Sequence, residues 1–214
     1  MNNIKEKYLK KIQHAAESII YLDEVNNLVI KKRIKKRYRL PEIDDSLRKF
    51  RTKSEASLIR KASRIGIDVP KIFCVGDDEI KMEYLGKKKI RDVITKKNYI
   101  KICKKIGFVI SQLHKNNIIH GDLTTSNMIL KEDRIYLIDF GLGFHSSRIE
   151  DKATDLHLLF KALESTHFSL SHDAWNVIIN SYKENYGDAD RVLSRLKKIK
   201  ERGRYKKNPD RKGF

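Results

Sequence analysis

The sequence predicts an α+β fold in two lobes, a small β-rich N-terminal lobe followed by a reduced, helical C-terminal lobe. Short apolar runs bounded by turn residues recur in the first 85 positions, before and after one predicted helix, and such runs are typical of strands. Longer segments with apolar residues three or four positions apart follow, and this spacing is typical of helices. A chain of 214 residues fits one compact unit or two small lobes. We expect two lobes, at residues 1–85 and 86–202, and a basic tail, expected to be mobile, at residues 203–214.

A polar segment, residues 120–141, carries the strongest chemical signal: HGDLTTSNMILKEDRIYLIDFG. Transfer of a terminal phosphate needs a carboxylate that orients the accepting hydroxyl or water, and further oxygens that bind Mg²⁺. We assign the first role to Asp122 and the metal to Asn127 and Asp139, while Gly141 lets the chain turn behind Asp139. Each part also occurs in ordinary turns, but their order and spacing are typical of kinases and predict ATP and Mg²⁺ as cofactors.

A strand, a turn of small residues and a second strand are predicted over residues 12–22. Kinases place a glycine-rich, phosphate-covering loop here, but this turn contains no glycine. Small side chains still let backbone N–H groups approach a phosphate. The expected nucleotide contacts are Ala15, Ala16, Glu17 and Ser18, with a solvated charge as the alternative for Glu17.

The next predicted strand, residues 28–30, ends at Lys31, our candidate for the lysine that contacts the nucleotide phosphates. Lys32 is its rival, because neighbours on a strand point to opposite faces. We prefer Lys31 because it shares a face with Val29. A basic strand end is the alternative, since residues 31–39 contain seven basic side chains.

A helix is predicted from Thr52, with Glu55 as the catalytic partner of Lys31. Thr52 and Glu55 also match a capping box, in which Glu55 would only stabilise the helix start. The order strand, lysine, helix, glutamate favours the ion pair.

Residues 71–76 and 79–86 predict a hairpin that ends at the linker between the lobes. Met82 would flank the adenine, and the backbone of Glu83 to Leu85 would pair with it. Packing in the core is the alternative for these side chains.

Further amphipathic helices are predicted over residues 98–116, from Asp151, and over 171–187 and 188–202. Residues 120–127, which carry Asp122 and Asn127, are called the catalytic turn. Asp155 either anchors this turn by hydrogen bonds or is an exposed acid near a helix start. Gly121 replaces the arginine that reads a phosphorylated activation loop in many kinases, so we expect no such switch.

Composition limits the remaining choices. The net charge is +19, and residues 191–214 hold eleven basic and two acidic side chains, which favours polyanionic partners. Scattered lysines are equally typical of a solvated surface. Cys74 and Cys103 lie in separate apolar segments and predict reduced, buried thiols. No apolar run reaches membrane-spanning length and no signal-peptide core is present, so we expect a cytoplasmic protein without a membrane partner.

The sequence resembles a known family, the small atypical kinase/ATPase subunits of the KEOPS assembly that makes threonylcarbamoyl-adenosine in tRNA. The resemblance covers nearly the whole chain. It is carried by residues 30–56, 120–127, 138–143, 150–156 and 202–204. The family normally has a glycine where Ala15 stands, which puts the nucleotide affinity of this chain in question.

This resemblance implies a miniature bilobal protein-kinase-like fold that hydrolyses ATP and autophosphorylates on serine or threonine. The implied active-site set is Lys31, Glu55, Asp122, Asn127 and Asp139. The implied partners are the threonylcarbamoyl-transferase, a small regulatory subunit, and tRNA reached through the complex and the basic tail. The alternatives are a RIO-like or small-molecule phosphotransferase, and a non-catalytic, nucleotide-gated adaptor.

Overall fold

A computed structural model describes residues 9–205, which fold into two compact units. Of these residues, unit 1 contains 9–87 and 136–141, and unit 2 contains 88–135 and 142–205. In this described part of the chain, no helix is both long enough and apolar enough to cross a membrane.

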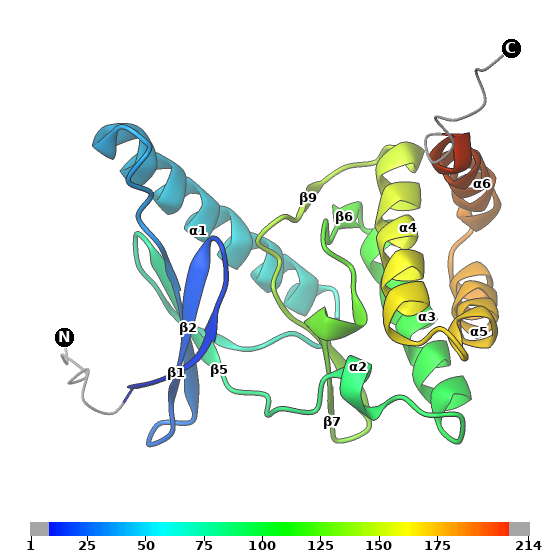
Figure 1. Ribbon diagram of the computed structural model, residues 1–214, viewed down its shortest axis with the longest axis horizontal. Coiled ribbons are helices and arrows are strands. Elements are labelled where there is room, and N and C mark those ends of the chain that lie inside the picture. Colours follow the sequence, from blue (N-terminus) through cyan, green and yellow to red (C-terminus); the bar gives the residue numbers. More distant parts are fainter. Residues whose placement is uncertain (1–8, 206–214) are drawn as a thin grey trace, which may run out of the picture. The chain divides into compact units, whose positions relative to one another are not determined.

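Unit 1 is built on an antiparallel sheet of five strands (Figure 1). In their order across the sheet the strands are β1 (Leu9–His14), β2 (Ser18–Asp23), β3 (Leu28–Arg33), β5 (Glu79–Glu83) and β4 (Ile72–Val75). The predicted hairpins therefore form. The prediction that Cys74 is buried is wrong, because β4 lies at the edge of the sheet and leaves this thiol exposed.

The long helix α1 (Pro41–Arg64) starts well before Thr52, the predicted first residue. Pro41 suits the first turn, where its missing N–H is not needed, and Glu42 suits the positive end of the helix dipole. The charged first half of the helix has little apolar periodicity, so its start is hard to recognise. Its buried face packs against β4 and β5, where Ala56 joins a core cluster with Ile80 and Met82.

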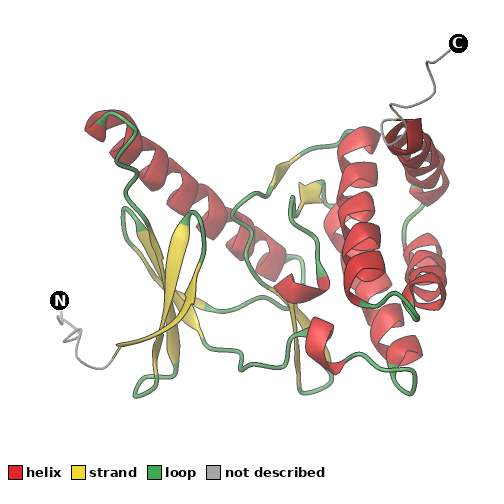
Figure 2. Ribbon diagram, viewed as in Figure 1, coloured by secondary structure: helices red, strands yellow, loops and turns green. Residues whose placement is uncertain are grey.

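Unit 2 is mainly helical (Figure 2). Its helices are α2 (Ile90–Val93), α3 (Tyr99–Lys115), α4 (Ile149–Thr166), α5 (Ser171–Asn185) and α6 (Ala189–Tyr205). Helix α3 packs against α5, and α4 packs against α6. Cys103 lies in the core as predicted, and burial raises the pKa of its thiol to about 12.

Helix α6 continues to Tyr205, three residues beyond the predicted end. The expected tail, residues 203–214, is therefore helical at its beginning. Its remaining residues, 206–214, lie outside the described part of the chain.

Short strands of unit 2 frame the predicted catalytic turn. Strand β6 (Ile118–Ile119) pairs with β9 (Phe144–His145), and the 3₁₀ turn η2 (Thr125–Asn127) leads into β7 (Met128–Lys131). β7 and β8 (Arg134–Leu137) form a hairpin. The catalytic turn is thus the connection between β6 and β7.

Candidate active site

Lys31 and Glu55 form a buried ion pair in unit 1. Nζ of Lys31 lies 2.6 Å from Oε1 of Glu55, and the two residues are 6% and 2% exposed. Alternation along β3 turns Lys31 inward and leaves its rival Lys32 exposed. Glu55 lies in the middle of α1, so the alternative in which it caps the helix start is wrong.

Arg33 is a third member of this cluster, and the motif analysis did not single it out. Its Nη2 atom lies 2.6 Å from Oε2 of Glu55, and its side chain is buried. Strand alternation places Arg33 on the same face as Lys31. Once the face that carries Lys31 is known to be buried, this spacing predicts that Arg33 is buried too. Loss of Glu55 would leave Arg33 buried without a carboxylate, which typically costs about 3–5 kcal/mol.

Asp139 joins the same cluster from a distant part of the sequence. Its Oδ1 atom lies 2.7 Å from Nζ of Lys31, and both residues belong to unit 1. Burial alone would lower the pKa of Lys31, but the carboxylates of Glu55 and Asp139 outweigh it and raise that pKa. Lys31 is therefore positively charged at neutral pH.

Gly141 has a different role from the predicted one. The left-handed backbone conformation belongs to Asp139, whose φ is +63°, and Gly141 does not have a positive φ. A Cβ atom on Gly141 would instead lie 3.0 Å from Oδ1 of Asp139 and 3.5 Å from Nζ of Lys31. Glycine is needed there because the charged groups pass close to its backbone.

The turn between β1 and β2 adopts its shape without glycine. None of its residues has a positive φ, and the backbone N–H of Ala15 donates to the carbonyl of Ser18 at 2.9 Å. Glu17 is not an isolated solvated charge, because its carboxylate lies 2.8 Å from Nη1 of Arg51. Lys36 also donates to the carbonyl of Ala16. The missing glycine therefore does not prevent an ordered turn.

The predicted adenine-binding segment is partly engaged within unit 1. Met82 is buried in the core with Ala56 and Ile80. The backbone N–H of Glu83 donates to Lys71, and that of Tyr84 donates to Asn27. Among residues 83–85 this leaves the N–H of Leu85 as the available backbone donor.

Asp122 and Asn127 are brought together in unit 2. The side-chain amide of Asn127 donates to the carbonyl of Asp122 at 2.9 Å and to Oδ2 of its carboxylate at 2.8 Å. The second bond fixes the orientation of the Asp122 carboxylate, and the first ties the Asn127 side chain to the backbone of Asp122. The amide nitrogen of Asn127 is used in both, so its oxygen remains to act as a ligand.

Asp155 anchors the catalytic turn. It is 1% exposed, and its carboxylate accepts hydrogen bonds from the backbone N–H groups of His120 at 2.8 Å and Gly121 at 3.0 Å. The alternative of an exposed acid is wrong. Burial alone would raise the pKa of Asp155, but hydrogen bonds from His114 and from the His120 backbone hold that pKa below its usual range.

His114 and Tyr182 extend this network, and neither was predicted. A carboxylate only accepts hydrogen bonds, so Nε2 of His114 is the donor to Asp155, at 3.4 Å. Nδ1, the other ring nitrogen, lies 2.9 Å from the hydroxyl oxygen of Tyr182 and forms a hydrogen bond with it. The fully buried position of His114 on the apolar face of α3 is the signal that would have identified it.

Gly121 cannot be replaced by a side chain without strain. Its φ is +78°, and a Cβ atom there would lie 2.2 Å from the carbonyl oxygen of Leu142. The turn therefore excludes an arginine at this position sterically.

The side-chain oxygens of Asp139 and Asn127 are the kind of ligand that binds a metal ion in complex with a nucleotide. Unit 1 offers the carboxylate of Asp139, whose side chain is 40% exposed, and unit 2 offers Oδ1 of Asn127. Residues 9–205 contain no cluster of three His, Cys, Asp or Glu that would bind a metal alone. Mg²⁺ in nucleotide sites takes only one or two protein ligands, because phosphates and waters supply the rest, so each donor taken by itself has the chemistry that Mg²⁺ requires.

Comparison with known proteins adds sequence relatives. A family model for the RIO domain matches residues 11–150. The KEOPS complex subunit Bud32 of Pyrococcus abyssi is 40% identical over 92% of this chain and 97% of that protein. A probable serine/threonine-protein kinase BUD32 homolog of Archaeoglobus fulgidus is 38% identical over 85% of this chain and 90% of that protein.

A longer relative also matches. The probable bifunctional tRNA threonylcarbamoyladenosine biosynthesis protein of Methanosarcina acetivorans is 36% identical over 92% of this chain. The match spans only 36% of that protein's length.

Solved structures with low sequence identity share the fold. The Rio2 kinase of Chaetomium thermophilum, in a complex with ADP, Mg²⁺ and phosphoaspartate, matches with a TM-score of 0.64 at 16% identity. The match covers 92% of this chain and 71% of that one. The ADP-bound aminoglycoside phosphotransferase APH(2'')-Ib matches with a TM-score of 0.55 at 15% identity, over 92% and 93% of the two chains. The predicted kinase-like α+β fold is thereby confirmed.

Proposed function

We propose a function for this chain from one premise: it belongs to the RIO-domain family and, within it, to the Bud32 subunits of the KEOPS complex. The chain is an ATP-dependent phosphotransferase of the serine/threonine-kinase type that acts in threonylcarbamoyladenosine biosynthesis on tRNA. It uses Mg²⁺, hydrolyses ATP and phosphorylates itself. Its lobes are residues 1–85 and 86–202, followed by the tail at 203–214.

The single observation that supports this activity best is the position of Lys31 between two carboxylates. A strand lysine paired with a helix glutamate holds the α- and β-phosphates in kinases, and an aspartate near it binds the metal. Lys31, Glu55 and Asp139 have the residue types and the contacts that these roles require. Arg33 supports Glu55 and therefore acts on Lys31 indirectly.

Asp139 and Asn127 would be the protein ligands of the metal, which would offset the charge of the phosphates. We propose that Asp122 accepts a hydrogen bond from the attacking water or from a serine or threonine hydroxyl and directs it towards the γ-phosphate. Asn127 keeps the Asp122 carboxylate in one orientation, and Asp155 fixes the backbone of the same turn.

The other nucleotide contacts are also part of this proposal. Backbone N–H groups of the turn formed by Ala15, Ala16, Glu17 and Ser18 would face the phosphates. The N–H of Leu85 and the carbonyl of Glu83 would pair with adenine, next to Met82. Glu17 would act by holding the turn, because its carboxylate is engaged by Arg51.

The proposed partners are the threonylcarbamoyl-transferase, a small regulatory subunit of the complex, and tRNA, and the proposed location is the cytoplasm. The support is the family of the relatives and the net charge of +19. The tail would contribute to tRNA affinity, and its truncation should then reduce the salt dependence of binding by about 0.7–0.9 in log–log slope per lost phosphate contact.

An Asp139→Asn variant tests the proposal. ATP turnover and phosphoserine or phosphothreonine formation are measured with and without the partner transferase, and nucleotide affinity is measured separately. We expect turnover to fall by about 100-fold or more, as for other groups that stabilise transition-state charge. Asp133→Asn, in the exposed β7–β8 turn, is the matched control. Wild-type turnover in the Asp139 variant would remove the metal assignment.

The same assay separates the alternatives. Strong turnover by the isolated chain on small alcohols would favour a small-molecule or RIO-like phosphotransferase. ATP binding without turnover, even with the transferase and tRNA present, would favour a nucleotide-gated adaptor.

A further inference from the structure

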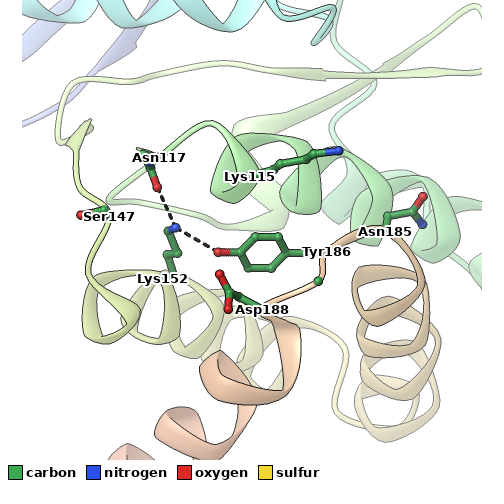
Figure 3. Close-up of a pocket in the computed structure, with 8 residues that line it drawn as sticks. Lys115, Asn117, Ser147, Lys152, Asn185, Tyr186 and Asp188 are labelled. Carbon is green, nitrogen blue, oxygen red and sulfur yellow. Dashed lines mark hydrogen bonds between the residues drawn. The ribbon is translucent and has the colours of Figure 1, made fainter.

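Unit 2 contains a hollow whose residues are distinct from those of the candidate active site. Its volume is about 610 Å³, and it lies where the end of α3, the first turn of α4 and the α5–α6 connection meet (Figure 3). The residues that matter here are Lys115, Asn117, Ser147, Lys152, Tyr186 and Asp188.

Lys152 is a buried cation with neutral partners. It is 3% exposed, and its Nζ donates to Oδ1 of Asn117 at 2.8 Å and to the hydroxyl oxygen of Tyr186 at 3.0 Å (Figure 3). Within residues 9–205, no carboxylate forms an ion pair with it. A buried ammonium group without an anion is unfavourable, because it loses hydration that neutral oxygens only partly replace.

The nearby acids are engaged elsewhere. Asp188 lies 3.1 Å from Nη1 of Arg191, and Asp151 accepts the hydroxyl of Ser146 at 2.6 Å. Lys152 also lies in the first turn of α4, where the helix dipole disfavours a positive charge. The local protein charges therefore do not explain why a cation is buried here.

Some hydrogen-bond donors of the hollow are not used by the described residues. Lys152 has three N–H groups and uses two of them. The oxygen of Tyr186 accepts from Lys152, but its own O–H donates to none of the described residues. Lys115 likewise has no hydrogen bond or ion pair within the described part of the chain. Asp188 is the single carboxylate in the lining.

We propose that this hollow binds a phosphate group, with Lys152 as its buried anchor and with Lys115 and the Tyr186 hydroxyl as further donors. A phosphate supplies the missing negative charge and several acceptor oxygens. Lysine binds phosphate as a point charge, whereas planar carboxylates are matched best by arginine, which is absent from this lining. The site is separate from nucleotide binding and stands whether or not the proposed catalytic activity does.

The test measures phosphate binding by the full chain. Inorganic phosphate is titrated against sodium chloride of equal ionic strength, and the melting temperature and the heat of binding are recorded. A ligand that binds only the folded state raises the melting temperature further with each increase of its concentration above the Kd, while the heat of binding saturates. We expect this rise in the wild type. Lys152→Met should weaken phosphate binding by about tenfold or more, because a charge-assisted bond is lost.

Matched variants separate this site from others. Lys161→Met removes an exposed lysine of the same helix and should leave phosphate binding unchanged. Tyr186→Phe keeps the ring but removes the hydroxyl, and it decides the question if the Lys152 variant fails to fold.

A phosphate effect no larger than that of chloride would overturn the proposal, as would unchanged phosphate binding in both the Lys152 and the Tyr186 variants. Lys152 would then serve only to join Asn117 to Tyr186. A dinucleoside monophosphate identifies the source of the phosphate. Competition with inorganic phosphate assigns a nucleic-acid backbone, and phosphate binding without such competition assigns a free phosphate or monoester.

Discussion

Arg33 bonds to Glu55 through Oε2, the carboxylate oxygen that Lys31 does not use. One buried carboxylate therefore holds two cations from the same strand. Lys31 also pairs with Asp139. Because Arg33 holds the Glu55 carboxylate, Arg33 influences the position of Lys31, the proposed phosphate-binding lysine, through Glu55.

Replacement of Arg33 by Met should therefore affect both stability and nucleotide binding. The free energy of unfolding should fall by about 1–3 kcal/mol, because a hydrogen bond to a charged, buried group is lost. The KM for ATP should rise, because Glu55 is less firmly held. Lys32→Met, on the exposed face of β3, should change stability by less than about 0.5 kcal/mol. Equal denaturation curves for the two variants would contradict this role of Arg33.

The ion pair of Glu17 with Arg51 should stabilise the β1–β2 turn in the absence of glycine. Exposed pairs contribute about 0.2–1 kcal/mol, so Glu17→Gln should raise the KM for ATP by about 1.4-fold to fivefold, less at high salt. Arg51→Met should have the same effect, and the double variant should be no worse than either. Glu24→Gln, which breaks an exposed pair with Lys10 at the other end of the hairpin, is the control. Additive effects of the two substitutions would exclude a direct coupling.

Gly121 and Gly66 form a matched test of steric exclusion. Both have left-handed backbones, with φ of +78° and +82°, but only at Gly121 does a Cβ atom meet another group, the Leu142 carbonyl. Gly66→Ala should cost about 1–2 kcal/mol from backbone strain alone. Gly121→Ala should cost about 1–3 kcal/mol more, because the backbone of the turn must move. Urea denaturation measures both, and equal losses would show that the clash is relieved easily.

Asp155 should make the stability of unit 2 sensitive to acid. The pKa of Asp155 is lowered in the folded state. Its contribution to the free energy of unfolding is therefore complete above the unfolded-state pKa, about 3.9, and is lost as pH falls through the folded-state pKa. Asp155→Asn should be less stable than wild type at pH 7 and should lose stability less steeply below about pH 4.

A second destabilised variant provides the control for this pH effect. Leu159→Val removes a buried methylene group from the same helix but keeps Asp155. Its stability should decrease at all pH values while the wild-type slope remains. The free energy of unfolding is measured by urea titration between pH 7 and pH 3. If it fell with pH equally steeply in the Asp155 variant and in wild type, Asp155 would not be the source of the acid sensitivity.

Local sequence patterns predicted much of the fold and identified the candidate active-site residues. Apolar runs located the strands of unit 1, and apolar spacing located α3 to α6 within a few residues, because these elements bury one continuous face. The start of α1 was not found, since its first half is charged. The exposure of Cys74 was also missed, because strand order in a sheet is not a local property.

The sequence by itself determined the class of fold and the chemistry to look for, because Asp122, Asn127 and Asp139 are residue types that phosphoryl transfer requires and lie close together in the sequence. Only the tertiary structure chose between the two readings of Glu55, added Arg33 to its carboxylate, and turned Asp155 and His114 into an anchor for the catalytic turn. These contacts join residues that are 22 to 108 positions apart. Tertiary packing decides which side chains that are far apart in the sequence come into contact, and the local pattern of apolar residues does not predict these contacts.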